Sequence, residues 1–331
     1  MIIESRAFAR AGLLGNPSDG YFGKTISIII KNFGASVQIY ETPELVIEEQ
    51  VEDKNEFRNI YHLTEIVKLT GYYGGNRLIK ASIKKFCEYC DKSNIKLSNK
   101  NFTIRYRTSI PRQVGLAGSS AIVTATMKGL MKFYDVDIPL KILPSLVLSA
   151  EVDELGINAG LQDRVIQAYE GCVFMDFEKE HMDKHNYGKY ESLDASNLPK
   201  LYLAYKTDLS KVSGTVLNNI KQRYNNGEKL VLDSLAEIAK CAEEGKKAIQ
   251  EKNHKKLFTL IDKNFNLRCK IMNISDSNME LVNTARSCGV SAKFSGSGGA
   301  IIGMYEDDEM LQKLIINLKK INARVIKPII L

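Results

Sequence analysis

A glycine-rich loop that leads into two serines and then a helix is the feature that most constrains this chain. Residues 111–125 read PRQVGLAGSSAIVTA, and apolar residues continue at helical spacing to Phe133. Glycines let the backbone come close to a ligand, and the first N–H groups of a helix have no partner inside it. Because the positive end of the helix dipole also favours an anion, the segment predicts a phosphate site. The alternative is a plain loop with serine caps.

The hydroxyl groups of Ser119 and Ser120 add chemistry to this loop, because one of them could hold a metal ion. The loop is not a Walker A motif, since no Gly-Lys-Ser/Thr closes it.

Two acidic residues follow the loop at positions that suit catalysis. Glu151 lies on an otherwise apolar helix face, where a carboxylate is either a solvated edge residue or a buried metal ligand. Asp163 follows a Gly-x-x-x-Gly turn near the start of a helix, and is either a cap or a general base. A general base, a phosphate loop and a metal carboxylate are the parts that a phosphotransferase needs.

Two further turns are weaker signals. Residues 10–19 place Arg10 at a strand and Asp19 in a tight turn; a buried Arg beside a carboxylate base would keep that base ionised. Residues 295–299 (SGSGG) are either a hairpin turn or a close approach of the backbone to a phosphate or sugar.

Composition narrows the class of protein. The 331 residues suit two lobes, 44% of them are hydrophobic, and no apolar run reaches membrane length. The N-terminus lacks a signal-peptide pattern, so we expect a cytoplasmic protein. The net charge of +7 is scattered without a basic block, which argues against nucleic acid and suits an enzyme with anionic substrates. The six cysteines, including Cys87 and Cys90, are expected to be buried or half-buried thiols.

The order of elements predicts an α+β fold. Paired strands are expected over 25–30 and 35–40, and a polar surface excursion over 178–197. The other expected strands are 102–107, 171–177, 201–205 and 323–327, with a strand–turn–strand over 292–303. The expected helices are 76–92, one from Ser119, 143–151, 161–169, 215–224, 229–251, 254–272, 277–288 and 307–320.

Three of these motifs, in this order, resemble the GHMP kinase superfamily, which includes galactokinase, homoserine kinase and mevalonate kinase. Residues 10–19 look like motif one, 111–121 like motif two and 293–300 like motif three. The resemblance implies a ribosomal-S5-like N-terminal lobe over 1–195 with the phosphate loop, and a ferredoxin-like C-terminal lobe over 196–331. ATP and Mg²⁺ are the cofactors that it implies.

Within the superfamily the chain looks like the plant-type glucuronokinase branch. The segments that carry this likeness are 12–19, 21–27, 111–123, 160–164, 175–184 and 293–300. The resemblance implies an ATP-dependent sugar 1-kinase that converts D-glucuronate to D-glucuronate 1-phosphate. The alternatives are another small-molecule kinase of the superfamily (galacturonate, galactose, heptose phosphate or mevalonate type) or a non-catalytic relative that binds a ligand or nucleic acid.

The resemblance also implies roles for individual residues. Asp163 would take the proton from the anomeric hydroxyl, with Arg10 paired to it, and Ser120 and Glu151 would hold Mg²⁺, with Ser119 close by. Tyr72 and Tyr73 would lie near the nucleotide or sugar. The ATP phosphates would be bound by backbone N–H groups of Gly115, Leu116, Ala117, Gly118, Ser119 and Ser120.

For the sugar acid, Asp19 would bind hydroxyl groups, and Gly296, Gly298 and Gly299 would shape the cleft. A substrate carboxylate needs a cationic partner, for which Lys24, Arg112 and Arg164 are candidates, each with a plain surface charge as the alternative. One departure is that Asn16 and Pro17 stand where galactokinase and mevalonate kinase carry Glu-His, so those contacts do not transfer.

Overall fold

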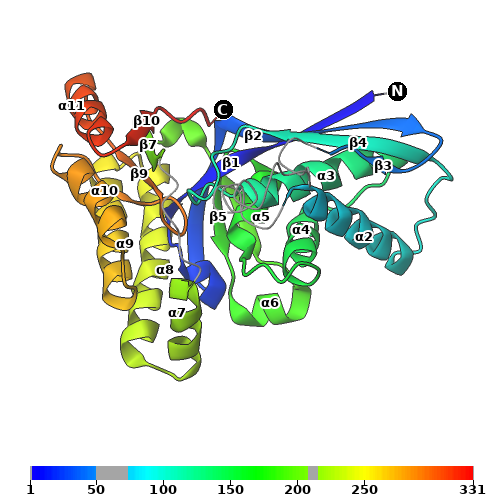
Figure 1. Ribbon diagram of the computed structural model, residues 1–331. Coiled ribbons are helices and arrows are strands. Elements are labelled where there is room, and N and C mark those ends of the chain that lie inside the picture. The colour runs from blue at the N-terminus through cyan, green and yellow to red at the C-terminus, as the bar shows by residue number, and fades with distance from the viewer. Residues whose placement is uncertain (1, 50–73, 208–214, 331) are drawn as a thin grey trace, which may run out of the picture. The chain divides into compact units, whose positions relative to one another are not determined.

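The computed structural model describes residues 2–49, 74–207 and 215–330 (Figure 1). Tyr72 and Tyr73, predicted to lie near the nucleotide or sugar, fall outside the described residues. The strands are β1 (Ile2–Leu14), β2 (Lys24–Thr42), β3 (Val46–Ile47), β4 (Asn101–Thr108), β5 (Cys172–Asp176), β6 (Lys189–Leu193), β7 (Leu201–Lys206), β8 (Lys293–Phe294), β9 (Ala300–Met304) and β10 (Ala323–Ile326).

The α-helices and short 3₁₀ turns are interspersed with these strands, partly in consecutive runs, in an α+β order. They are η1 (Ser18–Tyr21), α2 (Asn76–Lys92), α3 (Gly118–Tyr134), α4 (Leu143–Val152), α5 (Leu161–Tyr169), α6 (Lys179–His185), η3 (Ala195–Asn197), α7 (Thr215–Asn225), α8 (Lys229–Gln250), α9 (His254–Ile271), α10 (Asp276–Arg286) and α11 (Asp308–Lys319).

Contacts divide the chain into two compact units. Unit 1 comprises Met1–Ala9, Phe33–Ile110 and Ala117–Ala168, and unit 2 comprises Arg10–Asn32, Pro111–Leu116 and Tyr169–Leu331. The predicted lobes over 1–195 and 196–331 stay a prediction.

In unit 1, helices pack on a small sheet. The second half of β2 pairs antiparallel with β4, from Ala35 opposite Thr108 to Thr42 opposite Asn101, and β3 adds in parallel to β4. Helix α3 lies against β1 and β2, because the Ser5 hydroxyl donates to the Ala125 carbonyl at 2.6 Å and Gly129 leaves room for the Ile39 side chain. Helices α2 and α4 pack on α3 (Figure 1).

In unit 2, the first part of β2 pairs antiparallel with β5, and β5 with β6. A second sheet is antiparallel throughout, in the order β10-β7-β9-β8. Helix α9 packs on β8 and β9, with the Phe265 and Phe294 rings edge to face at 5.2 Å. The core around them also contains Tyr202, Leu281 and Leu314.

Most predicted elements are confirmed, with two corrections. The prediction of two paired strands over 25–30 and 35–40 is wrong, because the chain continues through Gly34 as the single strand β2, whose two parts pair with β5 and β4. The expected excursion over 178–197 instead contains α6 and β6, and β6 joins the sheet beside β5.

All six cysteines are buried or half-buried free thiols, as predicted. Burial raises the pKa of Cys90 to about 11 and that of Cys172 to about 12, so both stay protonated near neutral pH. Within the described parts of the chain, no helix is both long and apolar enough to cross a membrane.

Candidate functional site

The predicted phosphate loop ends in the first turn of the 17-residue helix α3. Gly115 and Ala117 both have left-handed backbones, with φ of 70° and 61°. Ala117 is the N-cap residue and makes no side-chain hydrogen bond to the helix start, so the alternative of a plain loop with serine caps does not hold. Ser119 and Ser120 lie inside the first turn, where N–H groups have no partner within the helix. This arrangement suits a bound anion.

The two glycine-rich turns of unit 2 pack directly against each other. A Cβ atom added to Gly115 would lie 2.8 Å from the Gly298 carbonyl oxygen, and one added to Gly296 would lie 2.4 Å from the Gly115 carbonyl oxygen. Gly299, with φ of 78°, lies against Val114. Residues 295–299 therefore form more than a hairpin turn, since their backbone supports the phosphate loop.

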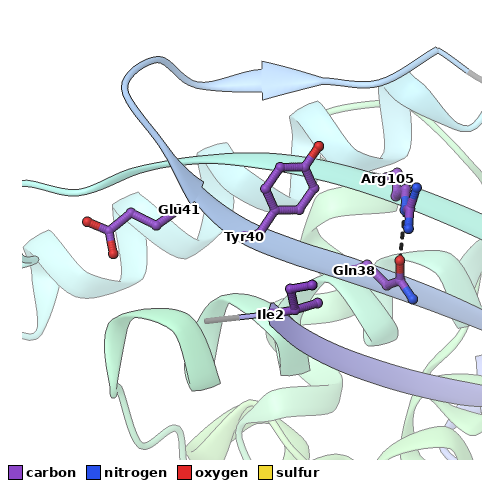
Figure 2. A pocket seen from close by; sticks show the side chains of 5 residues that line it. All are labelled: Ile2, Gln38, Tyr40, Glu41 and Arg105. Carbon is purple, nitrogen blue, oxygen red and sulfur yellow. Dashed lines mark hydrogen bonds between the residues drawn. The ribbon is translucent and has the colours of Figure 1, made fainter.

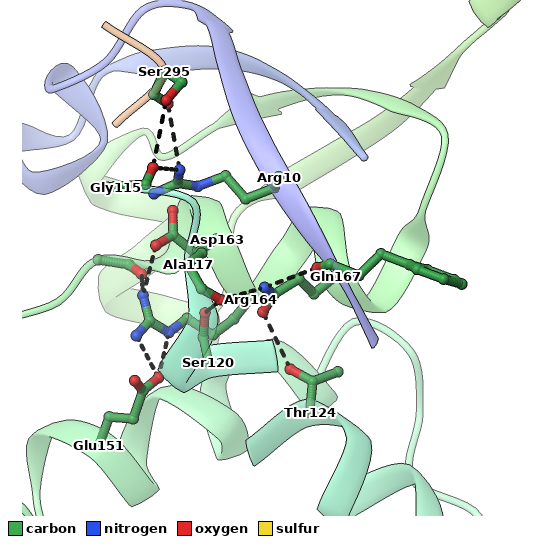
Figure 3. A network of polar contacts seen from close by, with 12 residues as sticks. Arg10, Gly115, Ala117, Ser120, Thr124, Glu151, Asp163, Arg164, Gln167 and Ser295 are labelled. Atoms are coloured by element: carbon green, nitrogen blue, oxygen red, sulfur yellow. Dashed lines mark hydrogen bonds and ion pairs between the residues drawn. The ribbon is translucent and has the colours of Figure 1, made fainter. Parts of the chain in front are cut away.

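Arg10 links these turns to β1. Its Nη1 donates to the Gly115 carbonyl at 2.5 Å and to the Ser295 carbonyl at 3.4 Å (Figure 3). The Gly12 N–H also donates to the Ser295 carbonyl, at 2.7 Å. Arg10 belongs to unit 2 and Asp163 to unit 1, and their pairing stays a prediction.

In unit 1, a buried ion pair joins α4 to α5. Glu151 is fully buried, and its Oε2 accepts hydrogen bonds from Nε of Arg164 at 2.8 Å and from Nη2 of the same guanidinium. Nη1 of Arg164 donates to the Gly160 carbonyl at 2.9 Å and lies 3.4 Å from Oδ2 of Asp163. Figure 3 shows the guanidinium between the two carboxylates. Arg164 therefore already has two carboxylate partners within the protein.

The other oxygen of Glu151 is compatible with the predicted role of metal ligand. Oε1 is buried and has no hydrogen-bond partner among the residues that the structure describes, which is unusual for a carboxylate oxygen. The Ser120 hydroxyl, also buried, donates to the Ala117 carbonyl at 3.1 Å and keeps its lone pairs for another partner. A carboxylate and a hydroxyl fit Mg²⁺, which takes few protein ligands beside phosphate oxygens and water.

Asp163 has a more exposed environment than Glu151. It lies in the first turn of α5, where the helix dipole favours a carboxylate, and its side chain is 20% exposed. Gln167, one helical turn later, donates to the Ala117 carbonyl at 2.9 Å and to the Phe8 carbonyl at 3.2 Å. This amide fixes α5 to the start of α3. Sequence reasoning missed it, since a glutamine on a helix carries no signal.

The remaining sugar-binding candidates have different environments. Lys24 lies 3.3 Å from a Glu243 oxygen and 3.8 Å from an Asp176 oxygen, so its charge is already balanced. Arg112 is exposed on the loop before α3, and Asp19 lies in η1.

Sequence reasoning also missed two buried cations of unit 2. Lys293, which was noted only as the first residue of a motif, is 1% exposed; its Nζ donates to the carbonyls of Gly12 at 2.6 Å and Phe294 at 2.8 Å and to Oδ1 of Asn16. Arg268 of α9 donates to the Gly296 carbonyl at 2.8 Å and to the Ser297 carbonyl at 3.3 Å. No pattern marked Arg268, because basic residues are common on amphipathic helices.

Desolvation affects both cations. Burial, followed by the charges of Arg268 and Arg10, lowers the pKa of Lys293 well below its usual value. Burial lowers the pKa of Arg268 to about 10, while Asp19 acts in the opposite direction. The Arg268 guanidinium, which stays charged near neutral pH, therefore places positive charge beside residues 296 and 297.

Unit 1 also has a pocket that contains none of the predicted site residues. Figure 2 shows it on β1, β2 and β4, lined by Ile2, Gln38, Tyr40, Glu41 and Arg105, with Arg105 held by the Gln38 amide at 2.7 Å. None of these residues was predicted to belong to the site.

The chain is similar to several known proteins. The family described as "GHMP kinases N terminal domain" matches residues 77–171. Glucuronokinase 1 of Arabidopsis thaliana is 46% identical over 319 residues, which cover 95% of this chain and 88% of that protein. Probable glucuronokinase 2 of the same plant is 43% identical, over 99% of this chain and 91% of that protein.

Two solved structures show the same fold. Galactokinase of Lactococcus lactis, complexed with galactose, aligns with a TM-score of 0.79 at 14% identity, over 99% of this chain and 93% of that one. Mevalonate kinase of Methanococcus jannaschii aligns with a TM-score of 0.71 at 22% identity, over 99% and 98% of the two chains.

Proposed function

This chain belongs to the GHMP kinase family, and we propose that it transfers the γ-phosphoryl group of ATP to the anomeric hydroxyl of D-glucuronate. The products are D-glucuronate 1-phosphate and ADP. The family and the α+β fold are confirmed as predicted. The observation that carries the substrate is the 46% identity to Arabidopsis glucuronokinase 1 over nearly the whole chain.

ATP would bind at the start of α3. The start of α3 has no side-chain cap, so its first N–H groups and the helix dipole would favour the phosphates of ATP. The close approach of Gly115 and Gly296 keeps side chains out of this part of the loop.

Ser120 and Glu151 would hold Mg²⁺ through the hydroxyl group and through Oε1, which accepts no hydrogen bond from the described residues. When bound, the ion would neutralise charge on the phosphate oxygens. Arg164 fixes the Glu151 side chain through its other oxygen, so Oε1 has a defined orientation.

Asp163 would be the general base. Its carboxylate would take the proton of the anomeric hydroxyl as that oxygen forms a bond to the γ-phosphorus and the bond from phosphorus to the ADP oxygen breaks. Arg164 and Gln167 hold the first turn of α5 in place, which supports the proposal that they position Asp163 for proton transfer. Asp19 would bind sugar hydroxyl groups, and Gly296, Gly298 and Gly299 would shape the sugar site.

The test is ADP release with Mg²⁺-ATP and a panel of acceptors: glucuronate, galacturonate, glucose, galactose, mevalonate and a heptose 7-phosphate. We expect turnover with glucuronate, and phosphorus NMR of the product should show a phosphate on the anomeric carbon. Turnover with another acceptor only would keep the family and replace the substrate. Lack of turnover with every acceptor would instead favour a non-catalytic relative.

A further inference from the structure

The proposed substrate carries a carboxylate, which needs a cationic partner in the protein. The buried cations of unit 2 are candidates for that partner. Of the three cations predicted from the sequence, Lys24 is balanced by Asp176 and Glu243, and Arg164 by Glu151 and Asp163. The third, Arg112, is exposed, so a contact with a carboxylate there would be weakened by water.

Arg268 has the opposite environment. It is 2% exposed, yet no carboxylate of the described residues lies within ion-pair distance of its guanidinium. Its hydrogen bonds to Gly296, Ser297 and the Met272 sulfur use three of its five N–H groups, and the other two make no hydrogen bond to the described residues. The Phe294 ring, 5.1 Å from the guanidinium carbon, restricts its plane.

Lys293 repeats this pattern beside it. Its ammonium group contacts three neutral oxygens and no carboxylate of the described residues. A buried charge without a counter-ion destabilises a fold, and proteins ordinarily pair such charges. The negative charge that is missing at Arg268 is therefore expected from a ligand.

The surroundings indicate which ligand. Arg268 and Asn16 both donate to the Gly296 carbonyl, and Asn16 accepts from Lys293, so the cations join residues 295–297 to the turn that carries Asp19. Asp19 also acts electrostatically on Arg268. Asp19 is the residue proposed to bind sugar hydroxyl groups, whereas the triphosphate has the α3 N–H groups and Mg²⁺.

We propose that Arg268 recognises the carboxylate of the sugar acid through its remaining N–H groups, and that Lys293 positions the turn beside it. This inference rests on the proposed function. It makes Arg268 the specificity-determining residue, because a guanidinium matches the two oxygens of a carboxylate and has no equivalent partner in a neutral sugar.

The experiment compares glucuronate with glucose as acceptors for the full chain and for Arg268→Met. For the variant we expect kcat/KM for glucuronate to fall about 100-fold, mainly through KM, as for the loss of a charge-assisted contact. We expect kcat/KM for glucose and KM for ATP to change less than about 3-fold. Arg223→Met is the matched control, because Arg223 in the same unit is paired with Glu228.

An equal loss with both sugars would overturn the proposal, because Arg268 would then only hold residues 296 and 297. A loss confined to KM for ATP would also overturn it, since the charge would serve the triphosphate. Arg268→Lys keeps the charge but not the bidentate geometry, so its kcat/KM for glucuronate should lie between those of the unchanged chain and Arg268→Met. If circular dichroism shows that Arg268→Met does not fold, Arg268→Lys is the variant that tests the proposal. Failure of the unchanged chain to phosphorylate glucuronate refutes the proposed function, whereas unaltered sugar preference in a folded variant refutes only this inference.

Discussion

Buried cations contact carboxylates in unit 1 and carbonyl oxygens in unit 2. In unit 1, the guanidinium of Arg164 lies against Glu151 and close to Asp163, so a buried cation meets carboxylates of its own unit. In unit 2, Lys293 and Arg268 contact mainly backbone carbonyl oxygens. Carbonyl dipoles offset only part of the cost of desolvating a cation.

The difference indicates that the buried cations of the two units have different roles. A charge that is balanced internally can orient its neighbours, as Arg164 orients Glu151, without needing a ligand. A charge that is not balanced favours the binding of an anion. We therefore expect changes in unit 1 to alter turnover and folding, and changes in unit 2 to alter ligand preference and pH dependence.

Replacement of the proposed base should have the largest effect. Asp163→Asn keeps the shape of the side chain but cannot accept a proton, so kcat should fall about 1,000-fold while ATP binding is unchanged. Steady-state kinetics and calorimetric titration with ATP measure the two quantities. Asp153→Asn, an exposed acid at the end of α4, is the control. Retained turnover in the Asp163 variant would remove Asp163 from the mechanism.

Breaking the internal pair should destabilise unit 1 strongly. Glu151→Gln leaves the buried guanidinium of Arg164 without its main counter-charge, and we expect the free energy of unfolding to fall by about 3 kcal/mol in urea titrations. The double variant Glu151→Leu/Arg164→Met should recover part of this loss. Glu154→Gln, at a half-buried acid paired with Lys84, should have a smaller effect. Equal losses at residues 151 and 154 would show that the burial of the pair does not matter.

A methyl group between the two glycine-rich turns should have an intermediate effect. Gly296→Ala places a Cβ 2.4 Å from the Gly115 carbonyl oxygen, so the backbone must move. We expect a loss of about 1–3 kcal/mol in stability and a higher KM for ATP. Gly20→Ala is the control, because no atom of the described residues, apart from its chain neighbours, lies within 4 Å of its added Cβ. The same result for both variants would argue against close packing of the turns.

The pH dependence of unit 2 should give the smallest effect. The groups that act on Lys293 are Arg268, Arg10 and the Cys241 thiol, whose own pKa burial raises to about 11. Between the lowered pKa of Lys293 and its ordinary value of 10.5, the unfolded chain binds more protons than the folded one.

The unfolding free energy of the unchanged chain should therefore rise with pH relative to Lys293→Met, by at most about 1.4 kcal/mol per pH unit. Urea titrations of both proteins from pH 7 to about pH 10 measure this difference. Parallel curves for the two proteins would mean that Lys293 does not titrate in this range, and would weaken the contrast between the two units.

The sequence by itself determined the features that depend on neighbouring residues. The start of α3 beside Ser119, the bounds of α2 and α5, and the position of Asp163 in a first helical turn follow from local periodicity and glycine placement. The order of three such motifs was enough to indicate the family and the proposed chemistry.

Only the tertiary structure decided which residues meet across long stretches of chain. Arg268 contacts residues 296 and 297, Lys293 reaches back to Gly12, and Glu151 and Arg164 pair between two helices. Whether an arginine is solvated, paired or buried without a carboxylate depends on the packing around it, and local sequence carries no record of that packing. Arg164 and Arg268 are both arginines on helices, and the sequence does not predict that one contacts carboxylates and the other contacts carbonyl oxygens.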